Sequence, residues 1–410
     1  MKKFIFVFFV FILNISNTFA DQNIEIIGGN SIATPPIAVM NFTNDTSTTN
    51  NLANIIATDL NITGDIKAIN VINKSQIESS VKYIVSGSVI GDTASYTLTL
   101  NTESNTVLLQ NKLLNLNKNT RLLAHTISNQ IYQKLTNTKG AFTSKIAYIV
   151  VDKNKYKLIV SDYDGYNPKV LISTNSILSS LAWNPNGSQI AYVSYEPNKP
   201  VVYVQDLYKP KRYIVAAFSG SNSSPTFTPD GNQLAVTLTK DGGSHIYLVD
   251  NTKYNADSIA IPVINWSTID TEANIADNES ILFTSNHDGG PQIFMANLSN
   301  TRTPQRLTLN LGKYNTTAKF AHDLSKITFI RRDGGTLRTY VEDLTTHASY
   351  PVSINTSLDL APSFAPNDKL ILFSSDNNQM YLVNTTGTTQ TNLKNIQYDQ
   401  IIDQRWSNSY

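Results

Sequence analysis

The strongest constraint on the fold is a segment that recurs through the last two thirds of the chain. Its clearest copy is Ser223–Asp250, SSPTFTPDGNQLAVTLTKDGGSHIYLVD. This copy contains a short strand ending at Phe227, a tight turn at Pro229-Asp230-Gly231, a second strand, a turn at Asp241-Gly242-Gly243 and a third strand. Three strands joined by two tight turns form a β-meander.

Six copies of the second strand follow one another at a nearly constant interval. They begin at Ile146, Ile190, Leu234, Ile281, Ile327 and Ile371, so the steps are 44, 44, 47, 46 and 44 residues. A period of about 40–45 residues with four short strands per unit is typical of a β-propeller blade, which buries its faces against its neighbours. The repeat therefore predicts an all-β, six-bladed β-propeller.

One blade is predicted to take its inner strand from the other end of the chain. Inner strands are recognisable at only five places, where they end in Trp183, Phe227, Ile275, Phe320 and Phe364. The C-terminus supplies the sixth, because Asp403-Gln-Arg-Trp406-Ser matches Ser180-Leu-Ala-Trp183-Asn. A propeller closed by this C-terminal strand has no free sheet edge at the joint.

Residues 36–140 show a different pattern, in which helical and strand periods alternate. Five strands are predicted, at Ile37–Phe42, Ala68–Asn73, Tyr83–Ile90, Tyr96–Leu100 and Val107–Leu116. Two helices are predicted from apolar stripes, the first at Leu52, Ile55, Ile56 and Leu60, the second at Leu123, Ile127, Ile131 and Leu135. Gly64 is expected to end the first helix, and Gly140 to follow the end of the second, which Asn119 or Thr120 would cap. This region is expected to be a compact α/β domain preceding a propeller of residues 141–410.

The first twenty residues are predicted to be a signal peptide. Lys2 and Lys3 precede an apolar run, and Thr18-Phe19-Ala20 forms a small-residue cleavage site, so cleavage is expected between Ala20 and Asp21. The alternative is an uncleaved membrane anchor, but the apolar run is short for a span of about 18 residues or more. The chain has no cysteine, which excludes disulfides and lipoprotein acylation. No later segment is long and apolar enough to span a membrane.

Residues 21–35 form a separate N-terminal segment before the α/β domain. The segment begins with alternating apolar residues and continues into the pair Gly28-Gly29. Two interpretations remain open: an ordinary first strand, or a detachable strand that hinges at the glycines and pairs with another protein.

Charge and motifs argue against nucleic-acid binding and against catalysis. The chain has 32 Lys and Arg against 31 Asp and Glu, so there is no net field to attract a polyanion. The G-x-S-x-G motif is absent, and the five histidines show no spacing typical of metal ligands. Asp162-Tyr-Asp164-Gly165 begins like a calcium loop but has Ser173 where the twelfth position requires Glu. We therefore predict no catalytic residue, metal or cofactor, and a hairpin turn at Asp162–Gly165.

Several of these segments together resemble the TolB family, periplasmic proteins of the Tol-Pal system of Gram-negative envelopes. The resemblance covers nearly all of the chain after the predicted signal peptide. It rests on PIAVMNF at Pro36–Phe42, YIVSGS at Tyr83–Ser88, SDYDG at Ser161–Gly165, the repeats, and above all the junction Ala124–Tyr148. It implies a periplasmic, non-enzymatic and monomeric adaptor that supports outer-membrane integrity and constriction during cell division.

The resemblance also implies two partner-binding regions. The propeller would bind the lipoprotein Pal through the loops that lead into its inner strands, with Ser221, Ser224, Thr271, Glu272, Thr317 and Asp359 as candidate contacts. The N-terminal segment would bind TolA through Ile24, Glu25, Ile26 and Ile27. Each loop residue has the alternative role of an ordinary connection between blades.

A metal-assisted exported propeller hydrolase is the second hypothesis. It requires several acidic, amide or histidine side chains that face inward from different blades. Only Glu272 and Asp359 are acidic candidates on the inner strands, so the sequence favours the adaptor.

Overall fold

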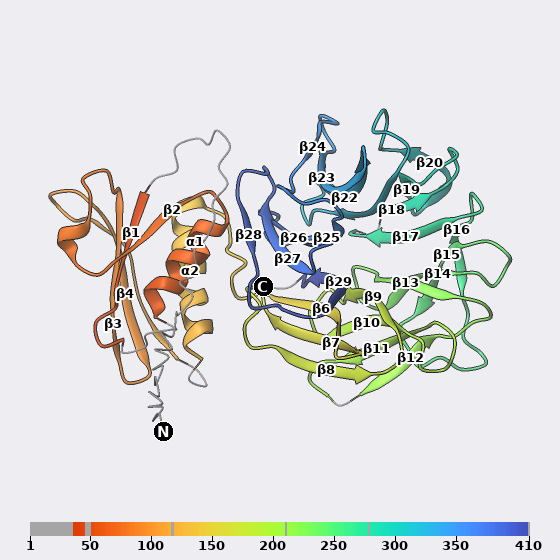
Figure 1. Ribbon diagram of the computed structural model, residues 1–410, viewed down its shortest axis with the longest axis horizontal. Coiled ribbons are helices and arrows are strands. Elements are labelled where there is room, and N and C mark those ends of the chain that lie inside the picture. The colour runs from red at the N-terminus through yellow and green to blue at the C-terminus, as the bar shows by residue number, and fades with distance from the viewer. Residues whose placement is uncertain (1–35, 46–50, 116–118, 210, 278, 409–410) are drawn as a thin grey trace, which may run out of the picture.

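The structure of this protein is a computed structural model that describes residues 36–45, 51–115, 119–209, 211–277 and 279–408. The chain forms an α/β domain beside a six-bladed β-propeller (Figure 1). The fold predicted from the repeat and from the alternating N-terminal pattern is therefore confirmed.

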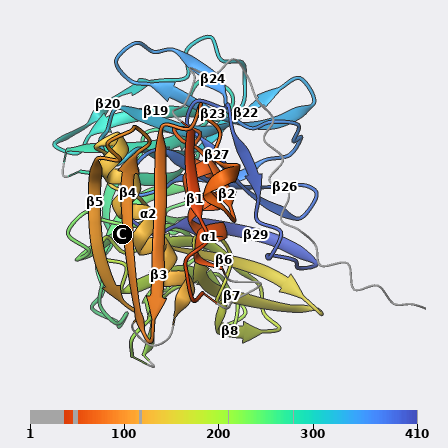
Figure 2. The same cartoon turned by 90° about the vertical axis from the view of Figure 1, so that its left-hand side faces the viewer.

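The α/β domain is built on one mixed sheet with the strand order β2-β1-β3-β4-β5. The strands are β1 (Pro36–Met40), β2 (Lys67–Val71), β3 (Tyr83–Ile90), β4 (Thr93–Leu100) and β5 (Val107–Leu114). β1 runs parallel to both of its neighbours, and the other pairs are antiparallel. A short 3₁₀ helix, η1 (Lys74–Gln76), lies between β2 and β3. The helices α1 (Leu52–Ile62) and α2 (Thr120–Thr136) lie behind the sheet, on the side of the propeller (Figure 2).

The helix ends follow local capping rules, with one correction to the prediction. Asn51 and Asn119 cap α1 and α2 by accepting backbone hydrogen bonds with their side chains. α2 ends before Asn137, which takes the left-handed conformation expected of Gly140. Gly140 is instead required by a close approach, because a Cβ there would lie 2.8 Å from the Cα of Asn129.

The propeller consists of six antiparallel four-stranded sheets. The first blade joins β29 (Gln400–Trp406), β6 (Lys145–Asp152), β7 (Lys155–Asp162) and β8 (Lys169–Thr174). The second contains β9 (Leu178–Trp183), β10 (Gln189–Ser194), β11 (Val201–Asp206) and β12 (Arg212–Ala216). The third contains β13 (Asn222–Phe227), β14 (Gln233–Leu238), β15 (His245–Asp250) and β16 (Ile261–Ile264).

The remaining three blades repeat this order. The fourth contains β17 (Asp270–Ile275), β18 (Ser280–Ser285), β19 (Gln292–Asn297) and β20 (Asn300–Arg306). The fifth contains β21 (Asn315–Phe320), β22 (Lys326–Asp333), β23 (Thr336–Asp343) and β24 (Ser349–Pro351). The sixth contains β25 (Leu360–Phe364), β26 (Leu370–Ser375), β27 (Gln379–Asn384) and β28 (Gln390–Asn392).

The C-terminal strand closes the ring, as the sequence predicts. β29 pairs antiparallel with β6, with Trp406 opposite Ile146. The Trp406 indole is buried and donates to Ser144 Oγ over 2.7 Å. The neighbouring inner strands are also tied to β29, because the Leu181 amide donates to Asp403 and the Gln404 side chain donates to the Leu360 carbonyl. The first and last strands of the propeller therefore form one blade.

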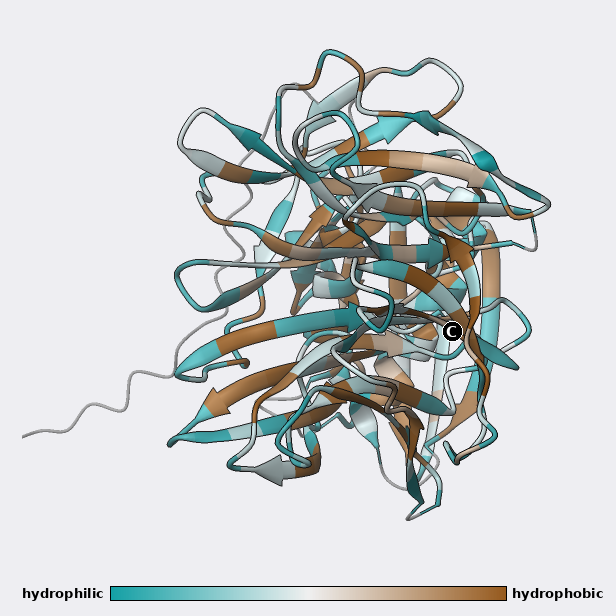
Figure 3. Ribbon diagram, turned by 90° about the vertical axis from the view of Figure 1, so that its right-hand side faces the viewer, coloured by the Kyte–Doolittle hydropathy of each residue, from teal (hydrophilic) through white to brown (hydrophobic). Residues whose placement is uncertain are grey.

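Apolar side chains fill the spaces between adjacent blades. Val204 of β11 and Leu234 of β14, for example, belong to one buried cluster that spans the second and third blades. Hydrophobic residues are concentrated along the strands, and the loops are mostly hydrophilic (Figure 3). A larger cluster continues from the α/β domain into the first and sixth blades and includes Ile127, Ile146 and Leu372. The two domains therefore share one continuous core.

Neither helix in the described part of the chain is long and apolar enough to cross a bilayer.

Candidate partner-binding surfaces

One end of the propeller gathers the loops that lead into the inner strands. The six inner strands all begin at this end because every blade has the same strand order, and we call it the mouth. A cavity of about 250 Å³ opens along the propeller axis there. Its lining includes one non-glycine residue with positive φ from each of five inner strands, with φ between 47° and 58°: Ser180, Ser224, Glu272, Thr317 and Ala361. Left-handed residues of this kind are strained and often occur at functional sites.

The predicted Pal-binding residues occupy three kinds of position at the mouth. Ser224, Glu272 and Thr317 line the cavity. Ser221 and Thr271 are half-buried outside its lining. The Ser221 amide donates to Thr239 Oγ1 in the β14–β15 turn of its own blade, and the Thr271 hydroxyl bonds to that of Thr237 in the preceding blade. Asp359 is fully buried. Its carboxylate accepts from the Thr339 amide over 2.8 Å, so Asp359 shapes a loop rather than presenting a charge to solvent.

An apolar rim surrounds the mouth. Five large apolar side chains in or beside the connections into the inner strands are between 40% and 63% exposed: Ile177, Ile269, Leu309, Leu358 and Leu360. Trp266 and His287 stack at the same end, with ring centroids 3.7 Å apart. Exposed apolar and aromatic groups around a polar depression are typical of protein-binding surfaces. We call the five apolar residues together with Trp266 the mouth rim.

A second cluster of charged residues lies between the two domains. His125 of α2 is buried and places its Nδ1 2.8 Å from Asp59 of α1. Its Nε2 lies 3.3 Å from Asp164 in the β7–β8 turn, close enough for an ion pair but not aligned for a hydrogen bond. Arg121, one turn earlier on α2, donates through Nε to Asp164 over 2.7 Å. Tyr163 donates its hydroxyl to Asp59 over 2.5 Å. These five residues, the interdomain network, join both helices to the first blade.

The protonation of the interdomain network follows from its charges. Burial lowers the pKa of His125, but Asp59 and Asp164 outweigh burial and raise the pKa to about 9. Burial raises the pKa of Asp164, but His125 and Arg121 outweigh burial and hold the pKa at about 2. At neutral pH the network therefore contains an imidazolium and a guanidinium facing carboxylates.

The stabilisation by His125 should decrease as the pH rises. The folded pKa of about 9 exceeds the ordinary value of about 6.5, so the contribution is complete below pH 6.5 and is lost as the pH passes through 9. The difference in unfolding free energy between the wild type and His125→Gln should shrink by about 3 kcal/mol between pH 6.5 and 9.5, at about 1.4 kcal/mol per pKa unit. Urea unfolding of both proteins at several pH values between 6.5 and 9.5 measures this difference. Because both proteins contain Lys319, whose lowered pKa has the opposite effect, its contribution cancels in the difference. A constant difference would contradict a charged His125.

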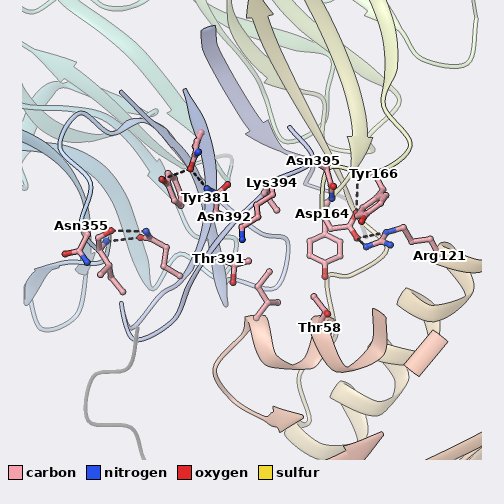
Figure 4. A pocket seen from close by; sticks show the side chains of 16 residues that line it. Thr58, Arg121, Asp164, Tyr166, Asn355, Tyr381, Thr391, Asn392, Lys394 and Asn395 are labelled. Carbon is pink, nitrogen blue, oxygen red and sulfur yellow. Dashed lines mark hydrogen bonds and ion pairs between the residues drawn. The ribbon is translucent and has the colours of Figure 1, made fainter. Parts of the chain in front are cut away.

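The domains also enclose a cavity of about 400 Å³. Figure 4 shows Thr58 of α1 opposite Thr391 of β28 and Lys394, which follows β28, with Arg121 and Asp164 at one wall. The Arg121 guanidinium lies over the Tyr166 ring, 3.4 Å from its centroid. The interdomain network thus supports one side of this cavity.

Sequence reasoning missed both the interdomain network and the interdomain cavity. His125 and Asp162–Gly165 carried part of the family resemblance, but His125 was otherwise only one of five histidines without metal-ligand spacing, and Asp162–Gly165 only a turn. The turn itself is present, because the Gly165 amide donates to the Asp162 carbonyl. The available signal was a stripe of polar residues at helical spacing, Arg121, His125 and Ser128, on a helix face that is otherwise apolar.

Two groups of predicted residues precede the described part of the chain. The signal peptide with Ala20 and Asp21, and the predicted TolA-binding residues Ile24, Glu25, Ile26 and Ile27, lie outside the described residues. Among the residues that the structure does describe, no three His, Cys, Asp or Glu side chains are grouped so that they could hold a metal ion.

Comparisons with known proteins identify relatives for both domains. The family model of the TolB β-propeller domain matches residues 132–410, and that of the TolB amino-terminal domain matches residues 22–88. The chain is similar to the Tol-Pal system protein TolB of Legionella pneumophila (strain Corby), with 36% identity over 37% of this chain and 40% of the relative. It is also similar to that of Wigglesworthia glossinidia brevipalpis, with 31% identity over 46% of this chain and 50% of the relative. The matched segments thus span half or less of these relatives' length.

A solved structure resembles the whole molecule. The crystal structure of TolB from Acinetobacter baumannii superposes with a TM-score of 0.81 at 28% identity, over 94% of this chain and 98% of that chain.

Proposed function

Because the chain belongs to the TolB family, we propose that it acts in the Tol-Pal system as a non-enzymatic adaptor that binds Pal at the mouth of its propeller. The observation that carries this proposal is the mouth itself, where strained channel-lining residues are surrounded by an exposed apolar rim. Ser224, Glu272 and Thr317 are the proposed central contacts. Ser221 and Thr271 would lie at their edge, and Asp359 would hold its loop in shape.

The rigidity of the mouth suits a binding surface. Glu272 Oε2 accepts hydrogen bonds of 2.8 Å from the Thr317 amide and from Thr284 Oγ1, so its carboxylate is fixed between two blades. A side chain that is already ordered loses little entropy when a partner binds. The mouth rim supplies apolar area around this fixed polar centre, which is the arrangement of many protein interfaces.

The N-terminal segment, residues 21–35, is proposed to bind TolA. Its alternating apolar residues and the glycine pair Gly28-Gly29 are suited to strand addition. The adaptor would then work in the periplasm after cleavage between Ala20 and Asp21, as a monomer, and would support outer-membrane integrity and constriction during cell division. The comparisons give no support to a metal-assisted hydrolase, since the relatives they find are TolB proteins.

Separate capture experiments test this division of roles. Deletion of Asp21–Ile32 should abolish capture of TolA in a pulldown and leave capture of Pal intact. Leu309→Glu should weaken Pal capture at least tenfold, because it places a charge in the mouth rim, and should leave TolA capture intact. The measurement uses the organism's own Pal and TolA.

Ile259→Glu is the matched control for the mouth. Ile259 is 73% exposed and lies in the β15–β16 connection, at the opposite end of the propeller. This variant should capture both partners as the wild type does. If the deletion abolished both captures or neither, or if the two glutamate variants behaved alike, the proposed roles of the mouth and the segment would be wrong.

A further inference from the structure

Two basic side chains meet at the middle of the propeller axis. Lys319 of β21 and Arg405 of β29 line the mouth cavity and also a second cavity of about 290 Å³ farther along the axis. The second cavity reaches the turns at the far end, where Pro185 and Pro229 line it. Leu181 is the third residue that the two cavities share. Lys319 and Arg405 therefore lie where the cavities join, and we call this place the channel waist.

The cations of the channel waist have donors without acceptors. Within the described part of the chain, the Lys319 ammonium makes no hydrogen bond or ion pair. Arg405 uses only Nη1, which donates to Asp403 over 2.7 Å and to the Ala361 and Gln404 carbonyls. Its Nε and Nη2 groups form none of the hydrogen bonds among the described residues. Several N–H donors are thus left without a protein acceptor in a confined space.

The nearby carboxylates of Glu272 and Asp403 accept hydrogen bonds from groups other than Lys319. Glu272 accepts from the Thr317 amide and Thr284, as described above. Asp403 accepts from the Leu181 amide over 2.7 Å, from the Gln404 amide over 2.9 Å and from Arg405. Burial and the adjacent Arg405 lower the pKa of Lys319 to about 7, although the charges of Glu272 and Asp403 oppose this shift. Among the described residues, these two carboxylates thus offset part of the positive charge of Lys319 without hydrogen-bonding its ammonium.

We propose that the channel waist binds a small oxyanion, a carboxylate or a phosphate, between Lys319 and Arg405. Such an anion accepts hydrogen bonds from the N–H donors of both cations that have no acceptor among the described residues. Either adjoining cavity has room for an ion of this size, since a water molecule occupies about 30 Å³. The channel waist adjoins the Pal contacts proposed at Ser224, Glu272 and Thr317, which line the same mouth cavity, but the proposal does not depend on them.

Calorimetric titration with inorganic phosphate, and in parallel with acetate, tests the proposal. At pH 7 and constant ionic strength the purified protein should bind one anion per chain. Binding of acetate, which does not titrate near pH 7, should take up about half a proton, because Lys319 is about half protonated there and the anion raises its pKa. Repeating the titration in two buffers of different ionisation enthalpy measures this uptake. Preference for phosphate or for acetate identifies the class of anion.

Variants make the test specific to the channel waist. Lys319→Met should weaken binding at least tenfold. Lys319→Arg should retain binding and should bind acetate without proton uptake, because neither arginine nor acetate titrates near pH 7. Lys240→Met, which removes a lysine paired with the exposed Asp241, should bind as the wild type does. If Lys319→Met does not fold, the ¹⁵N signal of Lys319 Nζ in the wild-type protein should still shift with added phosphate or acetate. Equal affinity in wild type and Lys319→Met, or no saturable binding of either anion, would overturn the proposal.

Discussion

A chain that ends at Asp399 should lose the cooperative unfolding transition of its propeller. The deletion removes β29, which supplies the inner strand of the first blade and contacts both neighbouring inner strands. The loss exposes one edge of β6 and opens the ring between the first and sixth blades. Urea unfolding followed by circular dichroism should show a broad transition with a lowered midpoint and slope.

A single substitution separates the packing of this strand from its backbone pairing. Trp406→Ala should destabilise the protein by about 3–5 kcal/mol, because it leaves a cavity in the core shared by the domains. Trp266→Ala is the control, since Trp266 is only partly buried in the mouth rim and its replacement should cost less than about 2 kcal/mol.

The truncated chain has its own contradicting outcome. An unchanged midpoint and slope in the truncated chain would show that the other five blades form a stable unit without β29.

Replacing His125 by Gln should cost about 3–5 kcal/mol at pH 6.5. The substitution leaves the buried carboxylate of Asp59 without its cation, and removing one partner of a buried ion pair is strongly destabilising. The transition should be followed by tryptophan fluorescence, because Tyr163 of the interdomain network stacks on Trp406, with ring centroids 6.1 Å apart.

Gln133→Ala provides the matched control on the same helix. Gln133 is exposed, and alanine preserves helix propensity, so the change should stay within about 0.5 kcal/mol. If His125→Gln lowers the free energy of unfolding no more than this control does, the interdomain network does not stabilise the joint between the domains. A loss accompanied by separate transitions for the two domains would show that the network also couples their unfolding.

The repeat made the propeller predictable because each blade carries the same local signals. Turn residues and a large apolar residue at the end of each inner strand mark five blades, and the match between Trp406 and Trp183 identifies the strand that completes the sixth. Local signals were less reliable at helix ends. Gly140 was expected to follow the helix end as a terminator. Glycine is needed there because a Cβ would collide with the backbone of Asn129, a contact that no local pattern reveals.

The candidate sites were predictable only where they follow from a position in the repeat. Ser224, Glu272 and Thr317 occupy equivalent places in successive inner strands, so all three line the same cavity. Asp359 begins the corresponding segment in the sixth blade, yet its side chain turns into the protein. The choice between a carboxylate that faces solvent and one that bonds a backbone amide depends on tertiary contacts. The same holds for His125 and Asp164, which meet only after the domains pack.

The pairing of β29 with β6 also sets an order in time. During synthesis β6 is made long before its inner partner, so its inner edge stays unpaired until β29 is available. Unpaired edges attract other strands, and this interval is when the nascent protein is most exposed to aggregation. Closure of the ring therefore follows the synthesis of β29, and a lag in supplying this strand would prolong the vulnerable state of the first blade.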